Sequence, residues 1–211
     1  TLLPGCLSEP LLLVNNAAGG LYTLSNVCTH RGAILVEEPR SCQSKSMRCR
    51  YHGRRFDLDG KYLSAPGFEH MGEADNFPAA QDHLAHLPMQ QWGPFIFNSL
   101  APALSFEAWT GDMQERLSFL PLQKLERRDE LTKDYVINAN WALYVDNYLE
   151  GLHIPFVHPS LTAVLDLKNY STELLPYGTL QLGVAAARGD SFDLPESSPD
   201  YGKAIGAYYY W

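Results

Sequence analysis

The sequence lacks an apolar run long enough to cross a bilayer. The longest runs, such as those at 11–14 and 34–36, fall far short of the roughly 20 residues that a membrane-spanning helix needs. The start of the chain also lacks an initiator Met and the basic flank and apolar core of a signal peptide. We expect no membrane partner, and we expect a fragment that begins inside a domain and stops within a strand at 207–211.

Basic residues are scarce. The chain has 16 Lys and Arg residues against 24 Asp and Glu residues, for a net charge of -8, and no run of Lys or Arg forms a stripe for phosphate groups. A nucleic-acid partner is therefore not expected. The acidic balance favours a neutral or cationic substrate, or a basic redox partner.

Cysteine is also scarce, with four residues in the chain. Cys28 and Cys49 each stand close to a His, which indicates metal ligation in a reducing compartment rather than disulfide formation. A cytoplasmic location follows as an expectation. Cys6 and Cys42 have no His at such spacing and are interpreted as ordinary small apolar residues.

What the chain does have is enough apolar material for a core, with 45% hydrophobic and 12% aromatic residues in 211. Up to about residue 100, short apolar runs alternate with Gly, Pro, Asn and Asp, which predicts an antiparallel all-β domain over 1–100. Within it we expect a hairpin around Asp59-Gly60 and a closing strand over 92–98.

The pattern changes after Ala101-Pro102, so a second domain is predicted over 101–211. Helices are expected over 107–119 and, with Asn140 as N-cap, over 141–152. Strands are expected over 133–138, 178–187 and 206–211. The predicted fold class is α+β, with an all-β domain followed by an incomplete α+β domain.

The first candidate site lies in two short segments, Cys28-Thr29-His30-Arg31-Gly32 and Cys49-Arg50-Tyr51-His52-Gly53, with 18 residues between His30 and Cys49. Each segment offers one thiolate and one imidazole. Two thiolates on one iron and two imidazoles on the other would hold a two-iron, two-sulfur cluster. Neutral imidazoles favour the reduced cluster and raise its potential from about -400 mV to between about -150 and +300 mV.

These two segments resemble the cluster-binding loops of Rieske proteins. The resemblance implies that Cys28, His30, Cys49 and His52 hold a [2Fe-2S] cluster. One departure is Arg54, at a position where many relatives have Trp. A structural zinc site is the alternative, although zinc fingers usually pair Cys with Cys and His with His, whereas each segment here mixes the two.

The second candidate site lies at 146–159, where Asp146, Glu150 and His153 are spaced to share one helical face and His158 follows Pro155. Two His and one carboxylate on one face of an iron is the arrangement of non-haem Fe(II) oxygenases. Asp146 and Asn147 are either outer partners of such a site or plain polar residues. The remaining histidines are interpreted as structural: His70, His83 and His86.

This second stretch resembles the mononuclear iron motif of Rieske ring-hydroxylating oxygenase catalytic (alpha) subunits and related monooxygenases. The resemblance implies that His153 and His158 are ligands of a mononuclear Fe(II). It also implies that Glu150 links this iron to the cluster of a neighbouring subunit in a homotrimer. The third ligand, a carboxylate, is expected to lie outside this chain; six acidic residues come too early to be named for it: Asp166, Glu173, Asp190, Asp193, Glu196 and Asp200.

The resemblance further implies a helix-grip fold for the second domain and a terminal oxygenase. Electrons would come from NAD(P)H through a ferredoxin or flavin reductase, and O2 would be used to hydroxylate a small organic substrate, either aromatic or a methylated amine. The alternative is a Rieske ferredoxin-like electron-transfer protein. Such a protein would end near Leu100 and would have no need for Glu150, His153 and His158.

Overall fold

The computed structural model describes residues 7–16, 20–41, 44–72 and 76–211. The chain divides into two compact units, 1–103 and 104–211. The interpretations of Cys6, Cys42 and the first six residues lie outside the described residues. Among the residues that are described, no helix is both long and apolar enough to span a membrane.

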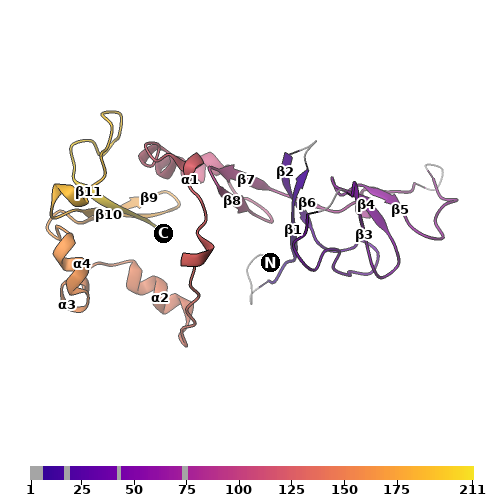
Figure 1. Ribbon diagram of the computed structural model, residues 1–211, viewed down its shortest axis with the longest axis horizontal. Helices are drawn as coiled ribbons and strands as arrows, with labels where there is room; N and C mark the ends of the chain where they lie inside the picture. The colour runs from indigo at the N-terminus through magenta and orange to yellow at the C-terminus, as the bar shows by residue number, and fades with distance from the viewer. Residues whose placement is uncertain (1–6, 17–19, 42–43, 73–75) are drawn as a thin grey trace. The chain divides into compact units, whose positions relative to one another are not determined.

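The first unit is built from short antiparallel strands (Figure 1). One three-stranded sheet has the order β1-β2-β6 and another the order β3-β4-β5. Their bounds are β1 Leu11–Asn16, β2 Gly20–Ser25, β3 Ser46–Arg48, β4 Arg55–Asp57, β5 Tyr62–Ser64 and β6 His86–Leu87. The turn at Asp59-Gly60 joins β4 to β5 as expected, with Gly60 at a φ of +80° that favours glycine.

The strand expected over 92–98 is instead the turn and second strand of a hairpin. β7 (Met89–Trp92) pairs with β8 (Phe95–Asn98), and Gly93 between them has a positive φ of 58°. The apolar character of Trp92 and Phe95 concealed this turn, because both residues favour strands. The Gly93-Pro94 pair was the available signal.

The core of the first unit is one cluster of buried side chains that includes both metal-candidate cysteines. Phe56 and Leu24 are fully buried at its centre. The full cluster is Val14, Leu24, Cys28, Leu35, Met47, Cys49, Phe56 and Leu84. The two cysteine-bearing loops are therefore anchored in the core of the β domain.

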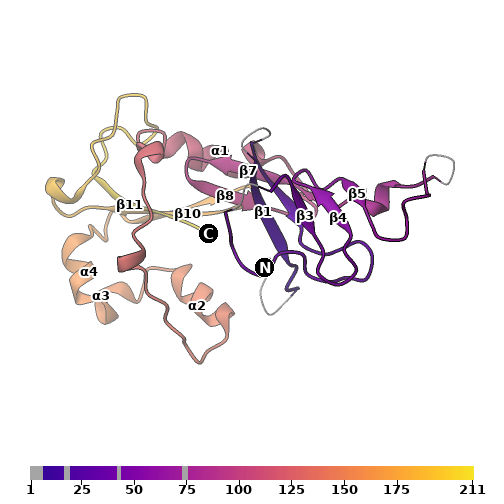
Figure 2. The same ribbon diagram turned by 45° about the vertical axis from the view of Figure 1, so that its right-hand side comes forward.

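The second unit is a three-stranded antiparallel sheet with helices on both faces, which agrees with the predicted α+β class. The strand order is β11-β10-β9, with α1 on one side and α2, α3 and α4 on the other (Figures 1 and 2). The bounds are α1 Phe106–Arg116, α2 Trp141–Tyr148, α3 Ile154–Val157, α4 Pro159–Val164, β9 Ser171–Leu175, β10 Gly178–Val184 and β11 Ile205–Tyr210. Leu180 and Leu182 of β10 belong to a core cluster with Leu194 and Ile205.

Two expectations for this unit need correction. Residues 133–138 form no strand: Val136 is fully exposed, and the alternating pattern has no neighbouring strand to pair with among the described residues. The helix starting at Trp141 ends at Tyr148 rather than Leu152, although Asn140 caps it as expected by accepting a hydrogen bond from the Ala142 amide. The early end precedes Gly151, where a Cβ would lie 2.9 Å from the Tyr170 ring.

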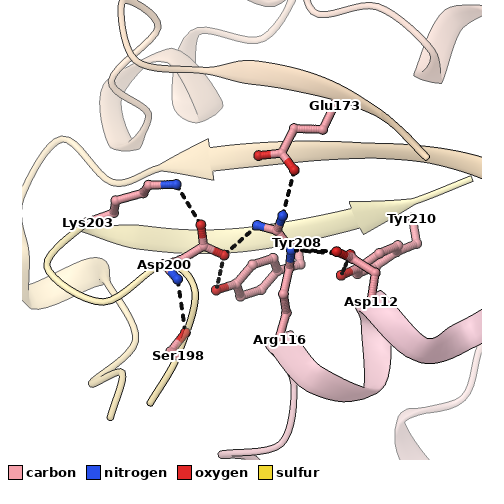
Figure 3. A network of polar contacts seen from close by, with 8 residues as sticks. All are labelled: Asp112, Arg116, Glu173, Ser198, Asp200, Lys203, Tyr208 and Tyr210. Carbon is pink, nitrogen blue, oxygen red and sulfur yellow. Dashed lines mark hydrogen bonds and ion pairs between the residues drawn. The ribbon is translucent and has the colours of Figure 1, made fainter. Parts of the chain in front are cut away.

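A buried polar network holds α1 against the sheet (Figure 3). Arg116 of α1 donates hydrogen bonds to Asp112 of the same helix, to Glu173 of β9 and to Asp200 of the loop before β11. The Asp200 side chain is only 1% exposed and also accepts from Lys203 and Tyr208. One guanidinium therefore ties a helix, a strand and a long loop together.

Candidate metal centres

The two Cys/His loops have the same backbone design. In the first, the Cys28 amide donates to the Ala33 carbonyl and the Gly32 amide donates to the Cys28 carbonyl. In the second, the Cys49 amide donates to the Arg54 carbonyl and the Gly53 amide donates to the Cys49 carbonyl.

The outer ends of the loops match as well. Val27 and Ile34 form an isolated antiparallel bridge, and Arg48 pairs with Arg55 at the same separation along the chain. The glycine of each loop has a positive φ, 72° at Gly32 and 76° at Gly53, which the turn requires. The two loops therefore present their side chains from equivalent turns.

These turns bring the four predicted cluster ligands together in two pairs. Cys28 and Cys49 are each 2% exposed and are free thiols, whereas His30 and His52 lie at the surface. The ring centroids of His30 and His52 are 4.7 Å apart. The thiols form an inner pair and the imidazoles an outer pair.

The electrostatics of the site suit a bound cation. Burial raises the pKa of the Cys28 thiol, and the adjacent Cys49 thiol raises it further. Desolvation lowers the pKa of His30, and the charges of His52 and Arg31 act in the same direction. A neutral imidazole is the ligand form of His, and a buried thiolate is favourable only beside positive charge.

The pairing of thiol with thiol and of imidazole with imidazole suits a two-iron cluster. A Rieske cluster needs two Cys at one iron and two His at the other, which is the grouping observed here.

The second candidate site lies in the other unit, beside a cavity of about 440 Å³. His153 and His158 both line this cavity, with ring centroids 5.1 Å apart. His153 directly precedes α3 and His158 directly follows it, so the short helix between them sets their separation. The cavity thus has two imidazoles at one wall.

Glu150 holds the first of these imidazoles. Its carboxylate is hydrogen-bonded to Nδ1 of His153 and also accepts from the Leu152 amide. The His153 hydrogen bond is the main reason why the pKa of Glu150 lies below its usual value. A carboxylate on Nδ1 makes that nitrogen the donor and leaves Nε2 with a lone pair for a metal.

Two details of the sequence prediction differ here. Because α2 ends at Tyr148, no continuous helical face joins Asp146 to Glu150 and His153. Glu150 and His153 instead meet in the segment that follows the helix. Asp146 is exposed, whereas Asn147 lines the cavity. None of the six downstream acidic residues lines it; Glu173 and Asp200 instead bind Arg116.

Structural roles are visible for two of the other histidines. Nδ1 of His83 accepts a hydrogen bond from the Tyr62 amide, and Nε2 of His86 is 2.8 Å from the Asp59 carbonyl oxygen. Both contacts tie β6 and the segment before it to the β4–β5 hairpin. His70 is exposed.

The cavity has an aromatic lining that was not predicted from the sequence. The tyrosines that line it are Tyr144, Tyr148, Tyr170 and Tyr209. Gln181 of β10 is hydrogen-bonded to the Tyr170 hydroxyl and donates to the Tyr148 carbonyl, which fixes this wall. Tyr209 alternates along β11 with Tyr208 and Tyr210, which face α1, so the strand period was an available signal.

Family models match both units in order. A model of the Rieske [2Fe-2S] domain matches residues 5–86, and a model of the ring hydroxylating alpha subunit (catalytic domain) matches residues 122–190. Together they include all four candidate cluster ligands as well as Glu150, His153 and His158.

Individual relatives give the same result. The chain is 32% identical over 194 residues to chloroplastic choline monooxygenase of Beta vulgaris, covering 86% of this chain and 41% of that protein. It is 27% identical over 197 residues to the carnitine monooxygenase oxygenase subunit of Acinetobacter pittii (strain PHEA-2), covering 92% and 52%.

A solved structure of a quaternary ammonium Rieske monooxygenase with an inhibitor matches at a TM-score of 0.64 and 26% identity, over 85% of this chain and 48% of that one. The chain thus spans about half the length of these relatives. It belongs to the family of Rieske non-haem iron oxygenase catalytic subunits, whose cofactors are a [2Fe-2S] cluster and a mononuclear iron.

Proposed function

We propose that this chain carries the redox centre and part of the active site of a terminal oxygenase that hydroxylates a small organic substrate with O2. The observation that carries the proposal is the convergence of two equivalent loops, which place two buried thiols beneath two imidazoles whose rings are 4.7 Å apart. The cavity beside His153 and His158 separates this reading from a simple electron-transfer protein.

Cys28 and Cys49 would hold one iron of the cluster, and His30 and His52 the other. His153 and His158 would hold the mononuclear iron. When bound, these centres supply one-electron transfer and the activation of O2. The exposed position of the outer His pair suits electron exchange with another protein, because it is the side of the site nearest the surface.

Glu150 is proposed as the positioning residue between the two centres. Its carboxylate fixes the His153 ring, and it is itself 41% exposed, so it remains accessible to a further donor. In the proposed homotrimer that donor is a cluster His of a neighbouring subunit. Electrons are proposed to come from NAD(P)H through a reductase or ferredoxin, and a cytoplasmic location stays a prediction.

For the substrate, we propose a methylated ammonium compound. The relatives include a choline and a carnitine monooxygenase. Four tyrosines line the cavity, and no Lys or Arg is among the residues lining it. Tyrosine rings attract cations that lie over their faces, by about 0.5–2 kcal/mol depending on desolvation.

The cluster is tested by purifying the chain without oxygen, reducing it with dithionite and recording low-temperature EPR with iron and acid-labile sulfide counts. A rhombic Rieske signal with two irons and two sulfides is expected, lost in His30→Ala and in His52→Ala but kept in the control His70→Ala. A colourless protein that holds one zinc ion would overturn the proposal. Because His153 and His158 are two ligands without the expected third, we expect the chain to bind the mononuclear iron weakly or not at all. A count near three irons would contradict that expectation and leave the cluster assignment intact.

The substrate class is tested by comparing choline with its neutral isostere 3,3-dimethyl-1-butanol in a binding titration. Choline is expected to bind about 2- to 30-fold more tightly, as the cation–π range implies. The preference should fall in Tyr209→Leu and persist in Tyr201→Leu, which changes an exposed tyrosine outside the cavity. Equal binding of the two compounds would exclude a cation-selective cavity.

A further inference from the structure

Arg54 is a charged residue buried at the end of the second Cys/His loop. It follows Gly53 in the second Cys/His loop and is 6% exposed. Its guanidinium does not lose its proton in proteins, so it is a permanent positive charge. A charge in such a place is costly unless it is paired and hydrogen-bonded.

The contacts of Arg54 cross from one loop to the other. Nη1 donates to the Thr29 hydroxyl at 2.7 Å, and Nη2 donates to Oδ1 of Asp82 at 3.2 Å. Cζ lies 5.1 Å from the centroid of the Tyr62 ring, within cation–π range. The Thr29 hydroxyl in turn donates to the Asp82 carbonyl at 2.9 Å.

Thr29 lies between Cys28 and His30 in the first loop, while the Arg54 carbonyl accepts from the Cys49 amide in the second. Arg54 is therefore hydrogen-bonded to the first loop through its side chain and to the second loop through its backbone. Asp82 pairs with the guanidinium: its carboxylate accepts hydrogen bonds from Arg54 and from the Ala79 amide. Of the two charged groups in this ion pair, the Arg54 guanidinium contacts Thr29 of the first loop, whereas Asp82 contacts Thr29 through its main-chain carbonyl.

The Arg54 guanidinium reaches the ligand segment of the first loop, because it donates to the hydroxyl of Thr29, the residue between Cys28 and His30. Reduction of a cluster adds one negative charge, which a buried cation nearby stabilises and a buried anion destabilises.

We propose that Arg54 is a positioning residue that ties the two ligand loops together and whose buried charge raises the reduction potential of the cluster. The inference rests on the proposed assignment of the cluster to Cys28, His30, Cys49 and His52. It concerns the reduction potential of that cluster and does not depend on which substrate is used.

The test is the midpoint potential of the cluster in the purified chain, from a redox titration followed by circular dichroism and EPR. Three variants change one charge each: Arg54→Gln removes the buried cation, Asp82→Asn removes its anion, and Arg55→Gln is the matched control. Arg55 is the next residue along the chain and is exposed, and its guanidinium donates to the Ser46 hydroxyl.

Arg54→Gln is expected to lower the ratio of reduced to oxidised cluster about tenfold at a fixed potential, which is about 59 mV for a one-electron couple. Asp82→Asn is expected to shift the potential upward, and Arg55→Gln to leave it nearly unchanged because water screens that charge. A merely structural role would reduce cluster content in both buried variants without shifting the potential in opposite directions.

Equal potentials in the unaltered chain and in Asp82→Asn, or a downward shift in Asp82→Asn, would overturn the inference. This holds even where Arg54→Gln fails to retain its cluster, because Asp82→Asn keeps Arg54 in place. Failure of the proposed function has a different signature, since the unaltered chain would then contain no cluster to titrate.

Discussion

Replacing Arg116 with methionine is expected to destabilise the unit 104–211 by about 3 kcal/mol, because it leaves the carboxylate of Asp200 buried without its main partner. Asp200 is 1% exposed and Arg116 is 11% exposed, and the two are 2.6 Å apart. Breaking a buried pair by removing one member typically costs about 3–5 kcal/mol.

Two features place the expected value at the lower end of that range. Lys203 remains 2.7 Å from Asp200 after the substitution, although its side chain is half exposed. The contacts of Arg116 with Asp112 and Glu173 add little, because those carboxylates are about one-third exposed and solvent screens them. Methionine keeps most of the apolar stem, so the lost volume is small.

The assay is urea unfolding followed by tryptophan fluorescence and far-UV circular dichroism, with the midpoint compared at unchanged slope. Arg127→Met is the matched control, since the Arg127–Asp129 pair is 78% and 79% exposed and should change the free energy of unfolding by less than about 0.5 kcal/mol. A loss below about 1 kcal/mol for Arg116→Met, or an equal loss in the control, would refute the reasoning that this network stabilises the unit.

Further predictions concern the same unit. Burial alone raises the pKa of Asp200, but hydrogen bonds from Lys203 and Arg116 outweigh it and hold the pKa below its usual value. The ionised Asp200 carboxylate therefore stabilises the folded chain above about pH 4, and this stabilisation is lost as the pH falls through the lowered pKa of the folded state. In unfolding curves measured between pH 5 and pH 2, the free energy of unfolding should consequently fall less in Asp200→Asn than in the unaltered chain. Gly111→Ala should raise the free energy of unfolding by about 0.5–1 kcal/mol, because Gly111 is exposed within α1 and a Cβ there meets nothing within 4 Å. Gly178→Ala should lower the free energy of unfolding, because a Cβ there would lie 2.5 Å from the Trp211 carbonyl oxygen. Urea unfolding curves check both glycine variants, and a shift of the same sign in the two would contradict the reasoning.

The parts of the fold that the sequence predicted are those with local signals. The Asp59-Gly60 hairpin, the Asn140 cap and the final strand depend on residues next to one another in the chain. The strand expected over 133–138 failed because alternation describes a side-chain pattern and says nothing about a neighbouring strand. The length of α2 was overestimated because Leu152 continues the spacing of apolar residues along the helix, yet its side chain is 82% exposed and lies outside the helix.

The candidate metal ligands could be named from the sequence because they stand in compact motifs, and their assignment as ligands stays a prediction. Their surroundings were not. Arg54 was visible only as a departure from the family pattern, and its contacts with Thr29 and Asp82 depend on residues 25 and 28 positions away. The cavity tyrosines come from α2, β11 and the segment before β9, which only the folded sheet brings together.

The matching turns of the two Cys/His loops determine which substitutions would disturb the proposed cluster site without replacing a ligand. Each loop is closed by main-chain hydrogen bonds that its Cys makes with the glycine and with the residue after the glycine, and the Arg54 side chain joins one loop to the other. Gly32 and Gly53 have the positive φ that these turns require. A bulkier residue at either glycine would therefore move a Cys and a His together.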